Sequence, residues 1–208
     1  MEMKKYGKLY EVNDRDRTGV LQMKTFEEKT ISSKKIFDGR VISLQVDKVE
    51  LPNGNISTRE IVRHPGAVAV VAITKDNKMI LVEQYRKPLE QSIFEIPAGK
   101  LEKGEDIEAS AKRELEEETG YTCKELEHLT SFYTSPGFAN EILHIYRAND
   151  LVYRNSLQTD EDEFVNVVEV TLEEALQMVK EKKITIMKIW FKKILNLFAN
   201  ALRGWNDL

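Results

Sequence analysis

Apolar and polar residues alternate with a period of two over much of the chain from Val41 onward, which is typical of β-strands. An Asn53-Gly54 turn separates the first two such segments and indicates a hairpin. The run "AVAVVAI" is apolar on both faces and predicts a central strand. The predicted strands span residues 41–51, 57–64, 67–73, 79–86, 92–97, 129–133, 141–147 and 165–170.

Three segments have helical signals instead. The first runs from about Asp106 to Thr119 and stops at Gly120, a residue that commonly ends helices. The second opens at Thr171 with Glu174 three residues later, which is a capping-box pattern. The third, residues 184–202, has apolar residues at helical spacing and reads as a packing helix. Strands and helices together predict an α+β fold, a mixed sheet with helices on its faces.

The pattern also divides the chain into regions. Residues 1–22 are charged and aperiodic, and we interpret them as a leader, a non-native remnant or a loosely attached tail. Residues 23–64 form an N-terminal β region and residues 65–182 the main domain. Residues 183–208 form a C-terminal helical region.

Bulk composition narrows the class of protein. The 208 residues are 41% apolar and 32% charged, as in ordinary globular proteins, and the net charge of −4 argues against a nucleic-acid-binding surface. The single cysteine, Cys123, cannot form an internal disulfide and reads as a small packed side chain. No apolar run approaches the roughly 20 residues that span a bilayer, and the N-terminus lacks a signal-peptide core, so we expect a cytoplasmic protein without membrane contact.

Four glutamates crowd into five positions of the first helix, Glu114 and 116–118. At about 100° per residue, Glu114, Glu117 and Glu118 share one face, which borders an apolar stripe of the helix. Carboxylates beside a buried face are costly without partners, and a hard divalent cation such as Mg²⁺ prefers oxygen ligands of this kind. The cluster therefore predicts a metal site, with a solvated acidic face as the alternative.

The residues around the cluster support the metal site. Gly99 permits close backbone approach, and Gly104 permits a bend before the helix. Glu105 lies near the helix start, where the helix dipole favours a carboxylate. Arg113 stands four residues before Glu117 and can hold that side chain in place.

The stretch Gly99–Tyr121, "GKLEKGEDIEASAKRELEEETGY", resembles the Nudix box at every defining position. The matching residues are Gly99, Glu105, Arg113, Glu114, Leu115, Glu117, Glu118, Gly120 and Tyr121. The resemblance implies the Nudix fold, an α/β/α sandwich with a mixed central sheet, here with an added N-terminal antiparallel strand region. It also implies a pyrophosphatase that uses Mg²⁺, with Mn²⁺ as the alternative ion.

A proline sixteen residues after Gly120, Pro136 in "SPGF", resembles the mark of the ADP-ribose pyrophosphatases. The segments "HPGAVAVVA" and "QYRKPLEQSIFEIPAGKLEKGE" are similar to bacterial members of that subgroup. The resemblance implies hydrolysis of ADP-ribose to AMP and ribose 5-phosphate. It also implies a homodimer in which the strands of residues 28–63 are swapped between subunits.

By the same resemblance, the metal ligands are Glu114, Glu117, Glu118 and the carbonyl of Ala98, and Arg113 orients the glutamates. Glu105 is structural or an outer ligand. The general base is expected in the acidic loop before residue 165, with Glu163 first and Glu161 second. The expected substrate contacts are Arg59, Glu60, Arg86, Glu95, Pro136, Gly137 and Phe138. The three histidines, His64, His128 and His144, read as structural because no metal spacing links them.

Three other functions remain open at this point. The enzyme can act on another nucleoside diphosphate sugar or a diphosphate cofactor, because the box alone does not select the substrate. A non-catalytic domain that senses ADP-ribose is a second alternative, although such domains usually lose box glutamates and this chain keeps them all. The third is a structural α+β domain whose acidic helix is solvated.

Overall fold

The structure is a computed structural model that describes residues 26–154 and 164–184. The expectations for residues 1–22, Glu161, Glu163 and the helix beyond residue 184 lie outside this part of the chain. The described residues form a smaller unit, which ends at Lys34 and resumes over Val46–Arg59, and a larger unit, which comprises Lys35–Gln45 and the residues from Glu60 onward. Each is described by itself.

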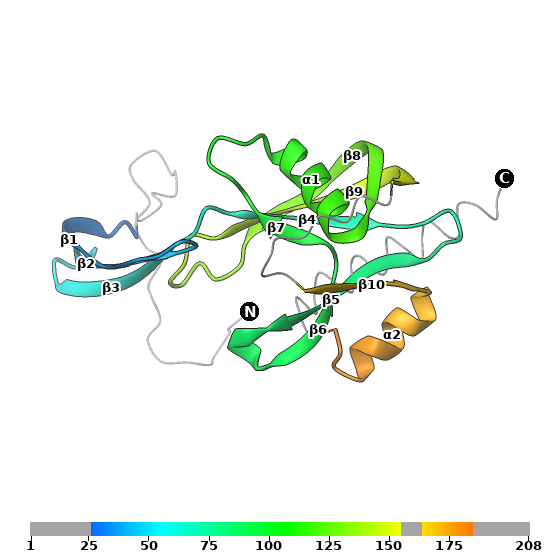
Figure 1. Cartoon of the computed structure of the whole chain (residues 1–208). Coiled ribbons are helices and arrows are strands. Elements are labelled where there is room, and N and C mark those ends of the chain that lie inside the picture. Colours follow the sequence, from blue (N-terminus) through cyan, green and yellow to red (C-terminus); the bar gives the residue numbers. More distant parts are fainter. Residues whose placement is uncertain (1–25, 155–163, 185–208) are drawn as a thin grey trace, which may run out of the picture. The chain divides into compact units, whose positions relative to one another are not determined.

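The elements follow the order in Figure 1. The strands are β1 (Lys29–Asp38), β2 (Ser43–Glu50), β3 (Ile56–Arg63), β4 (Ala67–Ala72), β5 (Met79–Arg86), β6 (Gln91–Glu95), β7 (Ala98–Lys100), β8 (Tyr121–Tyr133), β9 (Ile142–Tyr153) and β10 (Val165–Val170). The helices are a short 3₁₀ turn, η1 (Lys87–Leu89), and two α-helices, α1 (Ile107–Thr119) and α2 (Leu172–Lys180).

The strands form three sheets. The N-terminal sheet has the order β1-β2-β3. The second sheet has the order β7-β4-β9-β8 and is mixed, because β4 pairs with β9 in parallel and the other pairs are antiparallel. The third has the antiparallel order β10-β5-β6. The α+β class and the mixed sheet predicted from the sequence are confirmed.

The predicted central strand, β4, separates two apolar cores. Ala69 and Val71 face a core that also contains residues of β5, β9, β10 and α2. Val68 and Val70, on the opposite face, pack with Ala111 and other residues of α1. Because both faces are covered, β4 carries apolar side chains at every position. In Figure 1, α1 lies over the β7-β4-β9-β8 sheet and α2 lies beside β10.

The largest differences from the strands expected from the sequence are at β1, β8, β6–β7 and β9, which runs to Tyr153 instead of residue 147. β1 was not predicted as a separate strand, because all ten of its residues are exposed and give no buried face. β8 begins at Tyr121 instead of residue 129, because Cys123 is the one buried residue of this edge strand and gives no alternating pattern. The strand expected over 92–97 is β6, which already ends at Glu95, and β7 was not predicted; between them the chain passes Pro97 and changes from the third sheet to the second.

Helix α1 carries the acidic cluster, and its ends match the sequence signals. Asp106 is the N-cap, and its side chain accepts a hydrogen bond from the Ala109 N–H at 3.0 Å. Gly120 ends the helix with φ of 73°, a left-handed conformation that glycine adopts without a Cβ penalty. Ala111 and Leu115 are fully buried, so one face of the helix is fixed against the sheet.

We expect Asp106→Ala to lower the free energy of unfolding by about 1 kcal/mol, because the first turn of α1 loses its capping acceptor. Urea denaturation measures the change. Asp106→Asn is the matched control, since asparagine keeps a capping oxygen and should retain most of the stability. Equal stability of the alanine variant and the wild type would show that the cap contributes nothing.

Candidate active site

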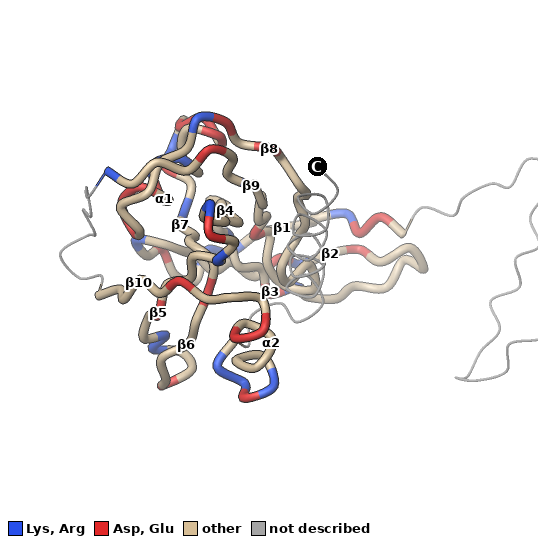
Figure 2. Tube along the Cα trace, turned by 90° about the vertical axis from the view of Figure 1, so that its right-hand side faces the viewer, with Lys and Arg blue, Asp and Glu red and all other residues tan. Residues whose placement is uncertain are grey.

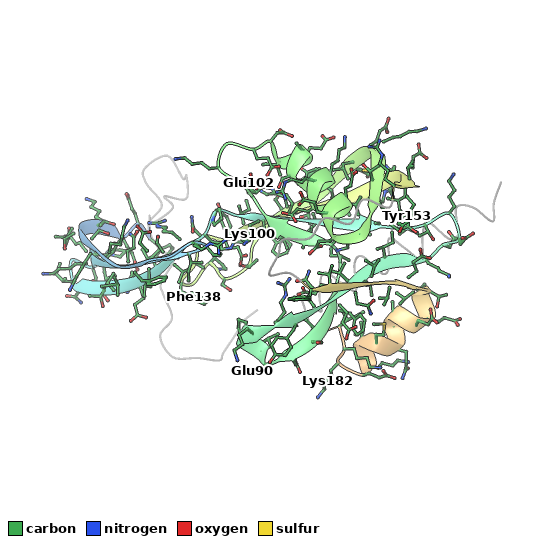
Figure 3. All side chains as sticks on the ribbon, in the orientation of Figure 1. Glu90, Lys100, Glu102, Phe138, Tyr153 and Lys182 are labelled. Carbon is green, nitrogen blue, oxygen red and sulfur yellow. The ribbon has the colours of Figure 1, made fainter. Side chains whose placement is uncertain are left out.

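Strand β7 and helix α1 bring the box residues together. β7 pairs with β4 and ends at Lys100, and the segment after it, on which Glu102 is labelled in Figure 3, leads to the start of α1. Figure 2 shows acidic and basic residues side by side along α1 and its flanking segments. The site is therefore built from one short strand and one helix that pack on the same sheet.

Gly99 is required by the carboxylate of Glu114. A Cβ at position 99 would lie 1.9 Å from Cδ of Glu114 and 2.1 Å from each of its carboxylate oxygens. No real Cβ tolerates such contacts, so the Glu114 carboxylate occupies the volume that a side chain at position 99 would need. The Glu114 side chain is 13% exposed and is held against the strand backbone.

Glu118 is the most deeply buried carboxylate of the cluster, at 2% exposure. It accepts hydrogen bonds from Gln84 Nε2 at 2.6 Å and from the backbone N–H of Ala98 at 2.9 Å. A buried charge needs donors of this kind, because desolvation otherwise penalises it strongly. Three elements, β5, β7 and α1, thus meet at one carboxylate.

Arg113 links the other glutamates. Its Nη1 donates to Glu114 Oε1 and to Glu117 Oε2, both at 2.9 Å. Its Nε and Nη2 donate to the two oxygens of Glu105 at 2.9 and 3.0 Å, a bidentate pair. These hydrogen bonds from Arg113 hold the pKa of Glu105 at about 2. The same contacts raise the pKa of the guanidinium above its usual value, so Arg113 stays charged.

We expect Arg113→Lys to raise the pKa of Glu105 from about 2 toward the ordinary carboxyl value of about 4.3, because one ammonium cannot replace a two-pronged donor. A pH titration of the Glu105 carboxyl carbon by NMR measures this change. Lys112→Ala is the control: Lys112 pairs with Glu108 at 3.1 Å and should leave the Glu105 pKa unchanged. An unchanged Glu105 pKa in Arg113→Lys would contradict the role assigned to the bidentate Arg113–Glu105 contact.

The cluster fits a divalent cation in donor type and charge. Its groups are hard oxygen donors. Three carboxylates, of Glu105, Glu114 and Glu117, pair with the Arg113 guanidinium, and the Glu118 carboxylate is held by the Ala98 N–H instead, so the four carboxylates and one guanidinium leave a formal surplus of three negative charges. Within residues 26–154 and 164–184, however, no group of three or more acidic, histidine or cysteine side chains is arranged so that it could hold a metal ion. In this arrangement Nη1 of Arg113 donates to one oxygen of Glu114 and to one oxygen of Glu117.

A cavity of about 650 Å³ adjoins the cluster, a volume typical of small-molecule sites. Three of the predicted site residues, Arg86, Glu95 and Ala98, line it together with Gly99. The remaining lining residues are Val41, His64, Ala67, Gln84, Pro88, Leu89, Ile93, Lys100, Thr134, Glu141 and Leu143.

Arg86 and Glu95 form an ion pair in the cavity wall. Nε of Arg86 donates to Glu95 Oε2 at 2.8 Å, and Nη2 donates to the same oxygen. Glu95 is 7% exposed, whereas the Arg86 side chain is 40% exposed. The buried carboxylate therefore fixes a guanidinium that still has an accessible side for an anionic ligand.

The other predicted substrate residues lie elsewhere. Arg59, on β3, pairs with Glu28 and also donates to Ser57 and to a backbone carbonyl. Glu60 is exposed on the same strand and does not line the cavity. Pro136, Gly137 and Phe138 are exposed residues of one turn, and Phe138, labelled in Figure 3, is 57% exposed. Their roles stay predictions.

Sequence reasoning missed four polar residues of this site. Gln84 is 8% exposed and donates a hydrogen bond to Glu118. Its one signal in the sequence is that it is a polar residue within a mostly buried strand. His64, Thr134 and Glu141 line the cavity from the end of β3 and from the loop before β9. All three histidines were predicted to be structural, but His64 lines the cavity. His128 and His144 lie outside the cavity and hydrogen-bond to one Ser131 hydroxyl, at 2.8 and 2.7 Å.

Two further observations bear on expectations from composition. Cys123 is buried, and burial raises the pKa of its thiol, in agreement with a packed side chain. None of the helices in the described part of the chain has the length and apolarity needed to cross a membrane.

The chain is similar to proteins of known family. Residues 63–190 match the NUDIX domain profile, and residues 28–62 match the profile of the nucleoside diphosphate sugar hydrolase N-terminal domain. The methanol dehydrogenase activator of Bacillus methanolicus is 67% identical over 162 residues, which cover 77% of this chain and 88% of the relative. The ADP-ribose pyrophosphatase of Bacillus subtilis (strain 168) is 61% identical over 163 residues, or 78% and 88% of the two chains.

A solved structure supports the same fold. The crystal structure of an ADP compounds hydrolase matches with a TM-score of 0.72 at 23% identity and covers 88% of this chain and 97% of that chain. The family profile spans more than half of the chain and contains the whole Gly99–Tyr121 stretch. The family resemblance and the fold expected from the sequence are confirmed, and the chain belongs to the NUDIX domain family.

Proposed function

We propose that the protein hydrolyses ADP-ribose to AMP and ribose 5-phosphate. The proposal is carried by an intact box together with 61% identity to an ADP-ribose pyrophosphatase. In the box, the Glu114 carboxylate lies against Gly99, and Glu118 accepts a hydrogen bond from the backbone of β7. The cavity beside the box is large enough for much of a sugar nucleotide. A sensing domain or a purely structural domain would not need the buried carboxylate cluster.

NUDIX proteins generally use a divalent metal, and we assign Mg²⁺ here, with Mn²⁺ as the alternative. Glu114, Glu117 and Glu118 and the Ala98 carbonyl would hold it. When bound, the ion supplies charge neutralisation at the diphosphate and a more acidic water. Arg113 keeps the carboxylates in place through its hydrogen bonds to Glu105, Glu114 and Glu117.

The remaining roles follow from charge and position. Arg86, fixed by Glu95, offers a positive charge to the diphosphate in the cavity.

We assign proton abstraction from the attacking water to Glu163, with Glu161 as the second choice; both lie outside the described residues. Replacing Glu163 by Gln should reduce kcat for ADP-ribose, and undiminished turnover would remove Glu163 from the mechanism.

The test is a product assay. Incubation with ADP-ribose and Mg²⁺ should release AMP and ribose 5-phosphate in equal amounts, detected by chromatography, and EDTA should stop the reaction. GDP-mannose and other diphosphate-linked sugars in the same panel separate the substrate alternatives. Binding of ADP-ribose without product would favour the sensor, and activity that persists in EDTA would rule out the metal role.

A homodimer is part of the proposal. Strand β1 is exposed along its whole length, and Ile31, Ile36 and Phe37 are each at least half exposed. Exposed apolar side chains on one strand favour a partner surface, and we assign a second copy of this chain. Light scattering should give twice the 24.0 kDa mass of the chain, and a monomeric mass would rule the dimer out.

A second candidate function is activation of a methanol dehydrogenase, favoured by the 67% identity to an activator over 88% of that relative. The test adds the protein to methanol dehydrogenase and measures the rate of methanol oxidation. A stimulated rate would support this function. Loss of the stimulation with Glu118→Gln would show that activation depends on the box.

A further inference from the structure

Two histidines outside the cavity meet at one hydroxyl near the edge of the β7-β4-β9-β8 sheet. Nε2 of His128 lies 2.8 Å from Oγ of Ser131, and Nδ1 of His144 lies 2.7 Å from the same oxygen. The two ring nitrogens are therefore at most about 5.5 Å apart, the sum of these distances. Strands β8 and β9 thus bring together two imidazoles that neither the box nor the cavity uses.

An irregularity in β8 assembles this cluster. Ser131 comes three residues after His128, and residues three apart on a regular strand point to opposite faces. His128 pairs with Tyr146 on β9. After a shift of register, Ser131 pairs with His144, which is two residues from Tyr146 and therefore on the same face of β9. His128 and Ser131 share that face as a result, and β-bulges commonly re-aim side chains in this way at functional sites.

The two rings are suited to bind a metal ion. The His128 ring packs edge-on against Tyr146, with the ring centroids 5.3 Å apart. Burial and the neighbouring His128 lower the pKa of His144, so the His144 ring is neutral at pH 7. A histidine must be neutral to act as a metal ligand, and His144 meets this condition.

The cluster is separate from the candidate active site. Leu143, which lines the cavity, is the neighbour of His144 in β9 and points to the opposite face. Gly99 of the box pairs with Val68 of β4, and Val68 pairs with His144, so His144 is two strands, or roughly 10 Å, from Gly99. Nδ1 of His144 faces Ser131 on β8, on the far side of β9 from β7. An ion held by the two histidines would share no ligand with the box.

We propose that His128 and His144 form a second metal site, which binds a divalent transition ion such as Zn²⁺ between the two rings, beside Ser131. Imidazole nitrogens suit Zn²⁺, Cu²⁺ and Ni²⁺, whereas Mg²⁺ prefers oxygen ligands. Zn–N bonds of about 2.0–2.1 Å in a tetrahedral site need nitrogens roughly 3.4 Å apart, so rotation of the exposed His128 side chain closes the remaining gap. The Ser131 hydroxyl and water complete the coordination, because no third acidic, histidine or cysteine side chain joins the pair in the described part of the chain.

The first test is a calorimetric titration of the tag-free, metal-free protein with Zn²⁺ in an excess of Mg²⁺. His128→Asn and His144→Asn should each weaken Zn²⁺ binding at least roughly tenfold, because even the hydrogen-bond partners of metal ligands contribute about 10–100-fold to affinity. His64→Asn is the matched control, since His64 is the third histidine of the chain and lies in the cavity wall. Glu118→Gln is the control for the box. Both control variants should keep the Zn²⁺ affinity of the histidine site.

The second test identifies the ligands in the wild type. The chain has three histidines, so the three single variants assign the ring signals in NMR spectra. Zn²⁺ should shift the ring signals of His128 and His144 and leave those of His64 unchanged. Zn²⁺ should also raise the Tm of the wild type more than that of the double variant H128N/H144N, because an ion that binds the folded chain stabilises it. Circular dichroism checks that every variant folds.

The outcomes separate this inference from the proposed function. Zn²⁺ binding that survives in both histidine variants and is lost in Glu118→Gln would place the ion at the box and overturn the second site. An equal loss in His64→Asn, or a wild type that binds no Zn²⁺, would overturn it as well. A protein that binds Zn²⁺ through the two histidines but releases no AMP from ADP-ribose would overturn the hydrolase alone.

Discussion

Replacing Glu118 by Gln should lower kcat for ADP-ribose by roughly 10³-fold while the protein stays folded. Catalytic groups that act through charge in a water-poor site typically contribute 10²–10³ each, and Glu118 is 2% exposed. The amide keeps the shape of the side chain and removes the negative charge that a divalent cation needs. Steady-state release of AMP at several Mg²⁺ concentrations measures the loss.

The free energy of unfolding of Glu118→Gln should change by no more than about 1 kcal/mol, because the Gln84 side chain can adapt to the new amide. The Gln84 amide now donates to Glu118 at 2.6 Å, and a 180° flip would let it accept from the new amide instead. The Ala98 N–H would keep its acceptor, so neither bond need be lost. Thermal unfolding with and without Mg²⁺ adds a second readout: the ion should raise the Tm of the wild type more than that of the variant.

Glu116→Gln is the matched control. Glu116 is not a box position, and the helical wheel places it away from Glu114, Glu117 and Glu118. Its replacement removes the same charge from the same helix and should leave kcat within about twofold. Equal losses in both variants would mean that the overall acidity of α1 matters, and wild-type activity in Glu118→Gln would remove that residue from the metal site.

The box could be predicted from the sequence because its determinants are local. The N-cap Asp106, the stop at Gly120 and the carboxylate face all follow from residue type and a 3.6-residue period over one helix. Such signals do not depend on what packs against the helix. The ends of α1 agreed with the expectation for that reason.

The remaining parts of the site depend on contacts between distant residues. Gln84 and Glu118 are 34 positions apart, and His64 and Asn140 are 76 positions apart. No period or motif links such pairs, and only the tertiary packing of strands, loops and helix α1 brings them together. Strand β1 and the first part of β8 escaped prediction for another reason, since strands with few buried residues lack the alternation that burial imposes.

Gly99→Ala is the prediction that tests the packing of the site most directly, and we expect roughly 10²-fold lower kcat/KM for ADP-ribose. The new Cβ would lie 1.9 Å from Cδ of Glu114, so the carboxylate must leave its place on the strand. The atoms that clash are the end of a flexible side chain, which can rotate at little cost. Alanine also restricts the unfolded chain more than glycine, so the free energy of unfolding should stay within about 1 kcal/mol.

Gly104→Ala should show the opposite combination. Its φ is +83°, a conformation that costs alanine about 1–2 kcal/mol, but a Cβ there meets no atom within 4 Å. We therefore expect lower stability in urea denaturation with kcat/KM close to the wild type, because no box carboxylate is displaced. The two alanine substitutions separate activity from stability only if Gly99 serves to seat the Glu114 carboxylate. Full activity in Gly99→Ala would show that the carboxylate can work from another position.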